Sequence, residues 1–166
     1  MLPPIQLRPE KRRRAGWHDT VDGVAWQDKR KPSQAFTETV LIRVSGVVIS
    51  GTGAWRPRIE RYPEVFRKVA DRYLFPGTLN VQLPEPLPIQ PDFRISGAEI
   101  GEPEQDMLFE RCAINGIPAF RLRPFQPATG LGGHGDHILE LVSPEELRPR
   151  LAGLPSVVVE FPRGEA

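Results

Sequence analysis

Proline residues are spread along the whole of this sequence, and they restrict the fold more than any other feature does. The chain has 19 prolines among its 166 residues. Proline fixes the φ angle, lacks a backbone N–H and disrupts helix interiors, so this density argues against long helices. The sequence therefore predicts strands, turns and loops. Its length is sufficient for one domain with a hydrophobic core, plus a tail.

Composition and cysteine usage are those of a soluble globular protein. Hydrophobic residues make up 39% of the chain and charged residues 26%. The single cysteine, Cys112, can form no internal disulfide and has no Cys/His zinc pattern around it, so we expect a reducing compartment and a small, buried strand residue. No apolar run reaches the ~20 residues of a membrane-spanning helix, and the N-terminus is charged where a signal peptide is apolar. We therefore expect a cytoplasmic monomer with no membrane partner.

Residues 1–36 have neither helical nor strand periodicity, and we predict a basic, proline-rich, flexible extension there. The segment KRRRAGW could bind nucleic-acid phosphates, with Trp17 stacking on a base. A solvated extension without a nucleic-acid role is the favoured alternative, because Asp19, Asp22 and Asp28 dilute the basic charge. The second predicted unit is a folded domain over residues 37–166.

The folded domain begins with a segment rich in β-branched residues, TETVLIRVSGVVISGTG, which predicts one long strand or two strands bent at Gly46. A helix is predicted to open at Pro63, because apolar residues recur at helical spacing and proline suits the first helical position. The dipeptide Asn115-Gly116 predicts a tight hairpin turn. The proline-rich LPEPLPIQP predicts an extended connection rather than a central strand.

Two more strands and a helix are expected after the hairpin. Strands are predicted at HILELV and SVVVEF, and the glycine-rich loop ATGLGGHGDH precedes the first of them. Ser143-Pro144-Glu145-Glu146 has the pattern of a helix start, which places Arg148 near the end of a short helix. About six strands and two short helices around one core predict a mainly β protein, a compact six-stranded β-barrel.

The segment FPGTLNVQL contains the most informative alternation of the chain. A strand sends alternate side chains to opposite faces, so Leu79, Val81 and Leu83 enter the core while Thr78 and Asn80 share the other face. One interpretation is a half-buried strand whose polar face meets water. The other is a pair of uncharged oxygen ligands for a metal, a phosphate or a sugar. The segment itself leaves both open.

Other polar candidates are less specific. No P-loop or G-x-G-x-x-G motif precedes a helix, but a glycine loop ends at Arg56 and Pro57, where Arg56 could neutralise a phosphate. His134 and His137 have poor zinc spacing, so a structural or substrate-contacting role is favoured over metal binding. Glu140 lies opposite Leu139 and Leu141 in an apolar strand. It either faces water or accepts hydrogen bonds from a polyol or ring N–H.

From about Gly46 to Phe161, the order of motifs resembles the archaeal-type CTP-dependent riboflavin kinases, which are small cradle-loop barrels. The motifs that carry the resemblance are SGTG, RYPEVFRKV, FPGTLNVQL and HGDHILELVSPEELRPRL. The resemblance implies that Thr78 and Asn80 hold Mg²⁺, and that Gly132 and Glu140 contact the flavin. It also implies nucleotide contacts at Thr52, Gly53, Ala54, Trp55, Arg56, Pro57, Glu145, Glu146, Leu147 and Arg148.

The implied reaction is attack of the riboflavin 5′-hydroxyl on the γ-phosphate of CTP, which yields FMN and CDP. Phosphoryl transfer needs mainly positioning and charge neutralisation, and Mg²⁺ needs few protein oxygens, so neutral ligands suffice. The chain has Ala54 and Trp55 in a shortened glycine loop, and Gly132 where the family commonly has a hydroxyl residue. The nucleotide donor and the acceptor alcohol therefore stay open, and no general base is assigned. The alternative of a different class is a non-catalytic flavin-, nucleotide- or nucleic-acid-binding protein.

Overall fold

The computed structural model describes residues 39–132 and 134–164. The extension predicted for residues 1–36, including its proposed contacts with nucleic acid, lies outside the described residues. Among the helices that are described, none has the length and apolar character needed to cross a membrane.

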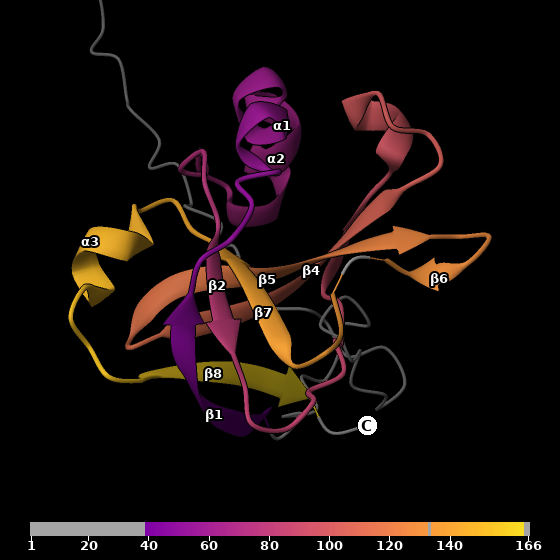
Figure 1. Ribbon diagram of the computed structural model, residues 1–166. Helices are drawn as coiled ribbons and strands as arrows, with labels where there is room; N and C mark the ends of the chain where they lie inside the picture. Colours follow the sequence, from indigo (N-terminus) through magenta and orange to yellow (C-terminus); the bar gives the residue numbers. More distant parts are fainter. Residues whose placement is uncertain (1–38, 133, 165–166) are drawn as a thin grey trace, which may run out of the picture. The chain divides into compact units, whose positions relative to one another are not determined.

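Six antiparallel strands close into a barrel, which confirms the predicted fold class (Figure 1). The pairing order is β4-β8-β1-β2-β7-β5, and β5 pairs back to β4 to complete the circle. Two short strands extend the sheet outside this circle, β3 (Phe93–Ile95) on β4 and β6 (Gly130–Leu131) on β5. The barrel strands are β1 (Thr39–Ile49), β2 (Leu79–Gln82), β4 (Asp106–Ile114), β5 (Ile117–Gln126), β7 (Ile138–Val142) and β8 (Val157–Gly164).

Strand β1 is continuous and changes its partner at Gly46. Residues up to Gly46 pair with β8, and residues 47–49 pair with β2. A Cβ atom at Gly46 would lie 2.6 Å from the backbone oxygen of Gln82, so only glycine allows the two strands to approach so closely. At Gly46, where the sequence predicts one long strand or a bend, β1 stops pairing with β8 and begins to pair with β2.

The β4–β5 hairpin turns where the sequence predicts it. Asn115 and Gly116 have φ angles of 46° and 80°, as the tight two-residue turn requires, and Ile114 pairs with Ile117 across it. This hairpin supplies the pairing that closes the barrel, because β4 also pairs with β8 and β5 also pairs with β7.

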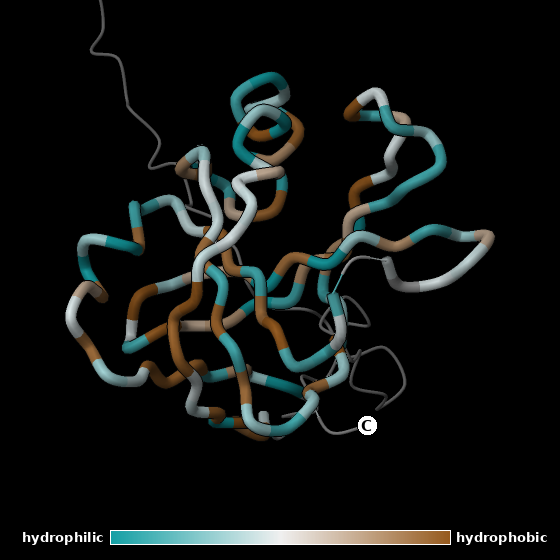
Figure 2. Tube along the Cα trace, viewed as in Figure 1, coloured by the Kyte–Doolittle hydropathy of each residue, from teal (hydrophilic) through white to brown (hydrophobic). Residues whose placement is uncertain are grey.

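Alternation along the strands fills the barrel interior. Leu79, Val81 and Leu83 of β2 are buried there as predicted, and Cys112 of β4 is buried with them. Figure 2 shows brown, hydrophobic segments along the strands of the barrel. The short helix α3 (Leu147–Leu151) contributes two leucines to the same cluster. The interior cluster therefore draws on all the barrel strands.

A second apolar cluster lies on the outer face of β4, β5 and β7. It contains residues of α1 (Arg56–Arg61), α2 (Pro63–Ala70) and the short 3-10 helix η1 (Gly97–Ile100). Phe66 of α2 is fully buried and meets Phe109 of β4 edge to face, with ring centroids 6.2 Å apart. In Figure 1 the helices α1 and α2 lie together, apart from α3. This cluster fixes the two helices beside the polar face of β2.

Two helix predictions need correction. Arg56 and Pro57, expected in a loop, form the first turn of α1, because Ile59 behind them packs into the outer cluster. The last helix begins at Leu147 rather than just after Ser143, which places Arg148 near its start. Ser143 does not cap this helix. Its Oγ accepts the N–H of Glu145 at 3.1 Å and donates to the carbonyl of Pro118 at 2.8 Å, which forms a turn instead.

Candidate functional site

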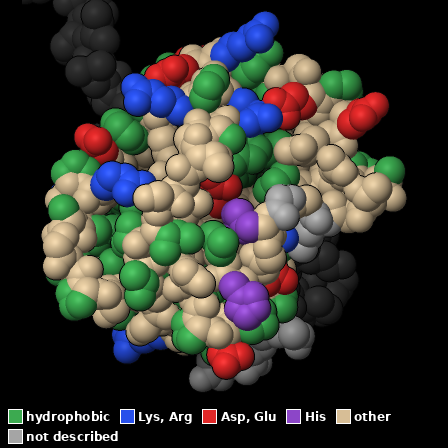
Figure 3. Space-filling model, viewed as in Figure 1, with side chains coloured by type: hydrophobic (Ala, Val, Ile, Leu, Met, Phe, Trp, Pro, Cys, Tyr) green, Lys and Arg blue, Asp and Glu red, His purple; other side chains and the backbone are tan. Residues whose placement is uncertain are grey.

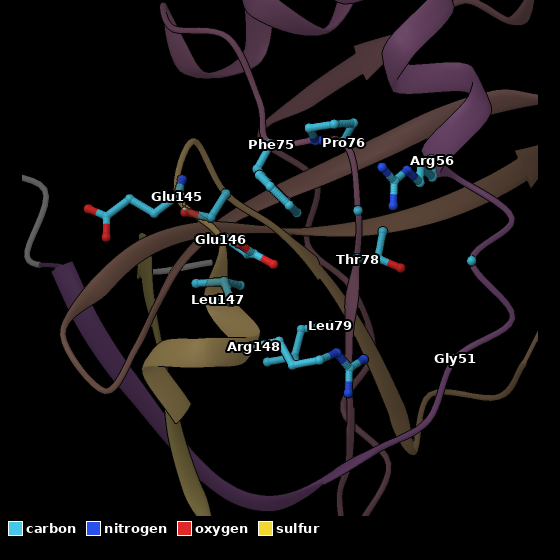
Figure 4. Close-up of a pocket in the computed structure, with 13 residues that line it drawn as sticks. Gly51, Arg56, Phe75, Pro76, Thr78, Leu79, Glu145, Glu146, Leu147 and Arg148 are labelled. Carbon is cyan, nitrogen blue, oxygen red and sulfur yellow. Dashed lines mark hydrogen bonds between the residues drawn. The ribbon is translucent and has the colours of Figure 1, made fainter. Parts of the chain in front are cut away.

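A cavity of about 250 Å³ opens where the glycine loop, the start of α1, the segment before β2 and the turn before α3 meet (Figure 4). It collects residues from three stretches that are far apart in the sequence, 51–56, 75–79 and 143–148. Strand β2 and the β7–α3 turn lie side by side because β2 pairs with β7. The lining residues are Gly51, Gly53, Arg56, Phe75, Pro76, Gly77, Thr78, Leu79, Ser143, Glu145, Glu146, Leu147 and Arg148.

Most of the residues that the resemblance assigns to the nucleotide reach this cavity, and four do not. Trp55 is buried in the outer cluster with 4% of its surface exposed, so its ring is unavailable to a ligand. Pro57 lines a separate cavity with Tyr62. Thr52 and Ala54 lie in the same loop but do not line the cavity. The sequence did not identify Phe75, Pro76, Gly77 and Ser143, although the Pro-Gly turn signals a close backbone approach.

Two arginines, Arg56 and Arg148, line the cavity together with Glu145 and Glu146. Arg148 has no carboxylate within 4.0 Å among the described residues, and Arg56 shares its charge with Glu60, at 3.0 Å from Nε to Oε1. Figure 4 shows Arg148 extending from α3 toward β2, whereas the Glu145 side chain extends away and pairs with Arg150. Arginines beside glycine backbone are suited to hold phosphate groups.

Thr78 and Glu140 face each other on the outer side of the barrel. The Thr78 hydroxyl donates a hydrogen bond to Oε1 of Glu140 at 2.9 Å. Glu140 lies opposite Asn80 in the β2–β7 register, and 13% of its side chain is exposed. The sequence prediction that Thr78, Asn80 and Glu140 point away from the barrel core is therefore confirmed by their strand faces.

Asn80 is half-buried like Thr78 but differs from it in its surroundings. Its Oδ1 is buried and has no hydrogen-bond partner among the described residues. The glycine loop covers it, because a Cβ atom at Gly51 would lie 3.0 Å from Asn80 Nδ2. Asn80 does not line the cavity that Thr78 lines. A buried carbonyl oxygen without a partner is costly unless something else binds it.

These two side chains have the chemistry of a magnesium site. A hydroxyl and a carboxamide are neutral oxygen donors, and Mg²⁺ takes a few such ligands together with water and phosphate oxygens. Because Thr78 donates its proton to Glu140, its oxygen lone pairs remain available to a cation. No group of three or more His, Cys, Asp or Glu side chains in the described residues could hold a metal by itself. The pair therefore fits a cation that is also held by a phosphate ligand.

His134 lies on the other side of Glu140. Its Nε2 is 3.7 Å from Oε2 of Glu140, and Glu140 raises the pKa of the imidazole above its usual value. Figure 3 shows histidine side chains at the surface of the viewed face. The Gly132 N–H donates to the carbonyl of Pro124 at 3.2 Å, and a Cβ atom there would meet nothing within 4 Å.

Comparison with known proteins assigns no family to this chain. A scan against models of protein families found no match, and a search among curated proteins found none either. The functional proposal therefore depends on the geometry of the cavity and on the order of the sequence motifs.

Proposed function

We propose that the protein is a Mg²⁺-dependent phosphotransferase that converts riboflavin to FMN with CTP as the phosphate donor. The observation that carries this proposal is the position of Thr78. Thr78 lines the cavity that Arg56 and Arg148 also line. Its hydroxyl donates a hydrogen bond to Glu140, the residue that the resemblance assigns to the flavin. A donor in the cavity and an acceptor at Glu140 would then lie on either side of Thr78, as direct transfer requires.

The proposed site divides its tasks among few residues. Arg56 and Arg148 neutralise phosphate charge, and the glycine loop allows the nucleotide to approach the backbone. Bound Mg²⁺, held by Thr78 and Asn80, would neutralise charge on the transferred phosphate. The acceptor hydroxyl forms a new O–P bond, the bond between the γ-phosphorus and the bridging oxygen breaks, CDP leaves and the hydroxyl proton is released. Glu140 orients the acceptor from the opposite side.

Incubation with riboflavin tests this proposal directly. The full chain is incubated with riboflavin, Mg²⁺ and each of the four ribonucleoside triphosphates in turn, and FMN is separated from riboflavin by chromatography. We expect FMN to accumulate most rapidly with CTP and to stop accumulating when Mg²⁺ is chelated. No FMN with any donor refutes the activity. FMN with another donor retains the chemistry and changes the nucleotide.

The covering of Asn80 favours one alternative, a non-catalytic protein that binds flavin or nucleotide on the same barrel. The carboxamide oxygen of Asn80 is buried beside Gly51, and Asn80 does not line the cavity. This alternative predicts quenching of riboflavin fluorescence without formation of FMN. Phosphoryl transfer to a different alcohol predicts the opposite pattern, with CDP released in the presence of another acceptor and no effect of riboflavin.

A further inference from the structure

The segment 134–137, which leads into β7, is anchored to the barrel interior by Asp136. Its Oδ1 accepts hydrogen bonds from Arg123 Nη1 at 2.7 Å and from Arg121 Nη2 at 3.4 Å. Both arginine side chains are buried, with 0% and 4% exposed. They alternate along β5 on the face that lines the interior, in the sequence FRLRP. A surface carboxylate thus reaches charges inside the barrel.

The carboxylate of Asp136 compensates part of the positive charge of the buried arginines inside the barrel. Arg121 also lies 3.7 Å from Oε2 of Glu110, whose Oε1 accepts a hydrogen bond from Arg163 at 2.7 Å. These five side chains carry three positive and two negative charges when ionised. Without the Asp136 carboxylate, the buried guanidinium groups would keep a larger uncompensated positive charge, which is strongly unfavourable. Asp136 is therefore held firmly in place.

Two residues before Asp136, the same segment brings His134 to the outer face of the barrel. His134 Nε2 faces Oε2 of Glu140, while Oε1 of Glu140 accepts the hydroxyl of Thr78. Glu140 thus accepts a hydrogen bond from Thr78, just before β2, and its second oxygen faces the His134 imidazole at 3.7 Å, a distance at which the two groups interact by charge rather than by a hydrogen bond. Its carboxylate keeps lone pairs that can accept further hydrogen bonds.

We propose that segment 134–137 is a positioning element for the acceptor: Asp136, fixed by the interior arginines, places His134 against Glu140 and so orients the Glu140 carboxylate toward a hydroxyl or ring N–H of the acceptor. The proposal rests on the proposed function for the identity of the acceptor. It makes His134 and Asp136 positioning residues rather than catalytic ones. A carboxylate that is hydrogen-bonded at one oxygen and faces an imidazole with the other binds a donor with little loss of rotamer freedom.

Three variants separate this role from a general structural one. His134→Gln removes the imidazole without touching the interior charges, and Asp136→Asn removes the anchoring charge at constant size. Glu160→Gln is the matched control, because its ion pair with Arg43 has an N–O distance of 2.5 Å and its side chain is 29% exposed, close to the 27% of Asp136. Glu160 belongs to β8 and has no part in the cavity.

The first readout needs no ligand. The pKa of His134 in the full chain is followed by NMR titration, with the signal assigned by its loss in His134→Gln. We expect a pKa above 6.5 in the unsubstituted protein and in Glu160→Gln, and a fall toward 6.5 in Asp136→Asn. An unchanged His134 pKa in Asp136→Asn overturns the anchoring role.

The second readout is affinity for riboflavin, measured by fluorescence quenching, with CTP binding measured by calorimetry on the same samples. We expect about 10-fold weaker riboflavin binding in His134→Gln and Asp136→Asn, with CTP binding and the Glu160→Gln control unchanged. If Asp136→Asn does not fold, the riboflavin affinity of His134→Gln alone tests the proposal. Equal riboflavin affinity in His134→Gln, or no riboflavin binding by the unsubstituted protein, overturns the proposal. Riboflavin binding without FMN formation refutes only the kinase activity.

Discussion

At the residue scale, the site depends on two polar side chains that share a strand face but differ in their surroundings. Thr78 lines the cavity and bonds to Glu140, whereas Asn80 is covered by Gly51 and its Oδ1 lacks a partner. The alternation of β2 determines that both point away from the barrel interior. Only the neighbouring loop determines which of them a ligand in this cavity can touch directly.

Asn80→Ala separates a ligand role from a structural role. Its Oδ1 makes no hydrogen bond with a described residue, so its loss should change the free energy of unfolding by about 1 kcal/mol or less. If Asn80 holds Mg²⁺, FMN formation should fall by roughly 100-fold. Denaturant unfolding and the FMN assay measure the two effects. Gln82→Ala, an exposed change further along β2, is the control and should alter neither.

The pair of His134 and Glu140 predicts a pH-dependent stability. Glu140 raises the folded-state pKa of His134 above the 6.5 of the unfolded chain, so the pair stabilises the fold fully below about pH 6.5. This contribution is lost as the pH rises through the folded-state pKa. The unfolding temperature of the unsubstituted protein should therefore exceed that of His134→Gln at acidic pH, and the difference should shrink on going to alkaline pH. A difference that grows with pH would contradict the pairing, and Glu140→Gln should abolish the trend.

At the element scale, strand β1 and helix α2 position the site from opposite sides. Strand β1 passes from β8 to β2 at Gly46 and then continues into the glycine loop of the cavity. Helix α2 is held on the outer face of β4 through Phe66 and Phe109. Neither element contributes a lining residue to the cavity, and their packing sets where Gly51 and Arg56 lie.

Gly46→Ala should destabilise the barrel where β1 meets β2. The added Cβ would lie 2.6 Å from the backbone oxygen of Gln82 and 2.6 Å from Cγ1 of Val81, so strands must separate. We expect a loss of about 3 kcal/mol in the free energy of unfolding, measured with urea. Gly132→Ala is the control, because an added Cβ meets nothing within 4 Å there, and it should stay within about 0.5 kcal/mol of the unsubstituted protein.

Phe66→Leu should loosen α2 without altering the barrel interior. Phe66 is fully buried in the outer cluster, and a smaller side chain loses contact with Phe109. The expected loss is about 1–2 kcal/mol in the free energy of unfolding. Hydrogen exchange should show faster exchange in α2 than in β8. Uniform acceleration in all elements would mean that α2 and the barrel unfold as one unit.

At the scale of the whole molecule, barrel closure brings the cavity together. The β4–β5 pairing and the β2–β7 pairing place the Pro76-Gly77 turn, the glycine loop and the turn before α3 around one space. Strand β1 begins at Thr39 and pairs there with Gly164. The described barrel is therefore closed by contacts among residues after position 38.

Deletion of residues 1–36 tests the predicted domain boundary. Every strand pair of the described barrel lies after this segment, so we expect the unfolding temperature and FMN formation to remain essentially unchanged. Binding to single-stranded nucleic acid at low and high salt is measured in parallel. If the basic extension binds nucleic acid, salt-sensitive binding should disappear on deletion. A large fall in the unfolding temperature would show that the extension belongs to the folded domain.

The sequence by itself determined the features that depend on neighbouring residues. The alternation in β2, the Asn115-Gly116 turn, the start of α2 at Pro63 and the long strand through Gly46 follow from backbone preferences that act over a few positions. The tertiary structure alone decided that Arg56 starts a helix, that Gly51 covers Asn80 and that Asp136 reaches Arg123. These contacts join residues distant along the chain, and they exist only because the strand register that closes the barrel sets them side by side.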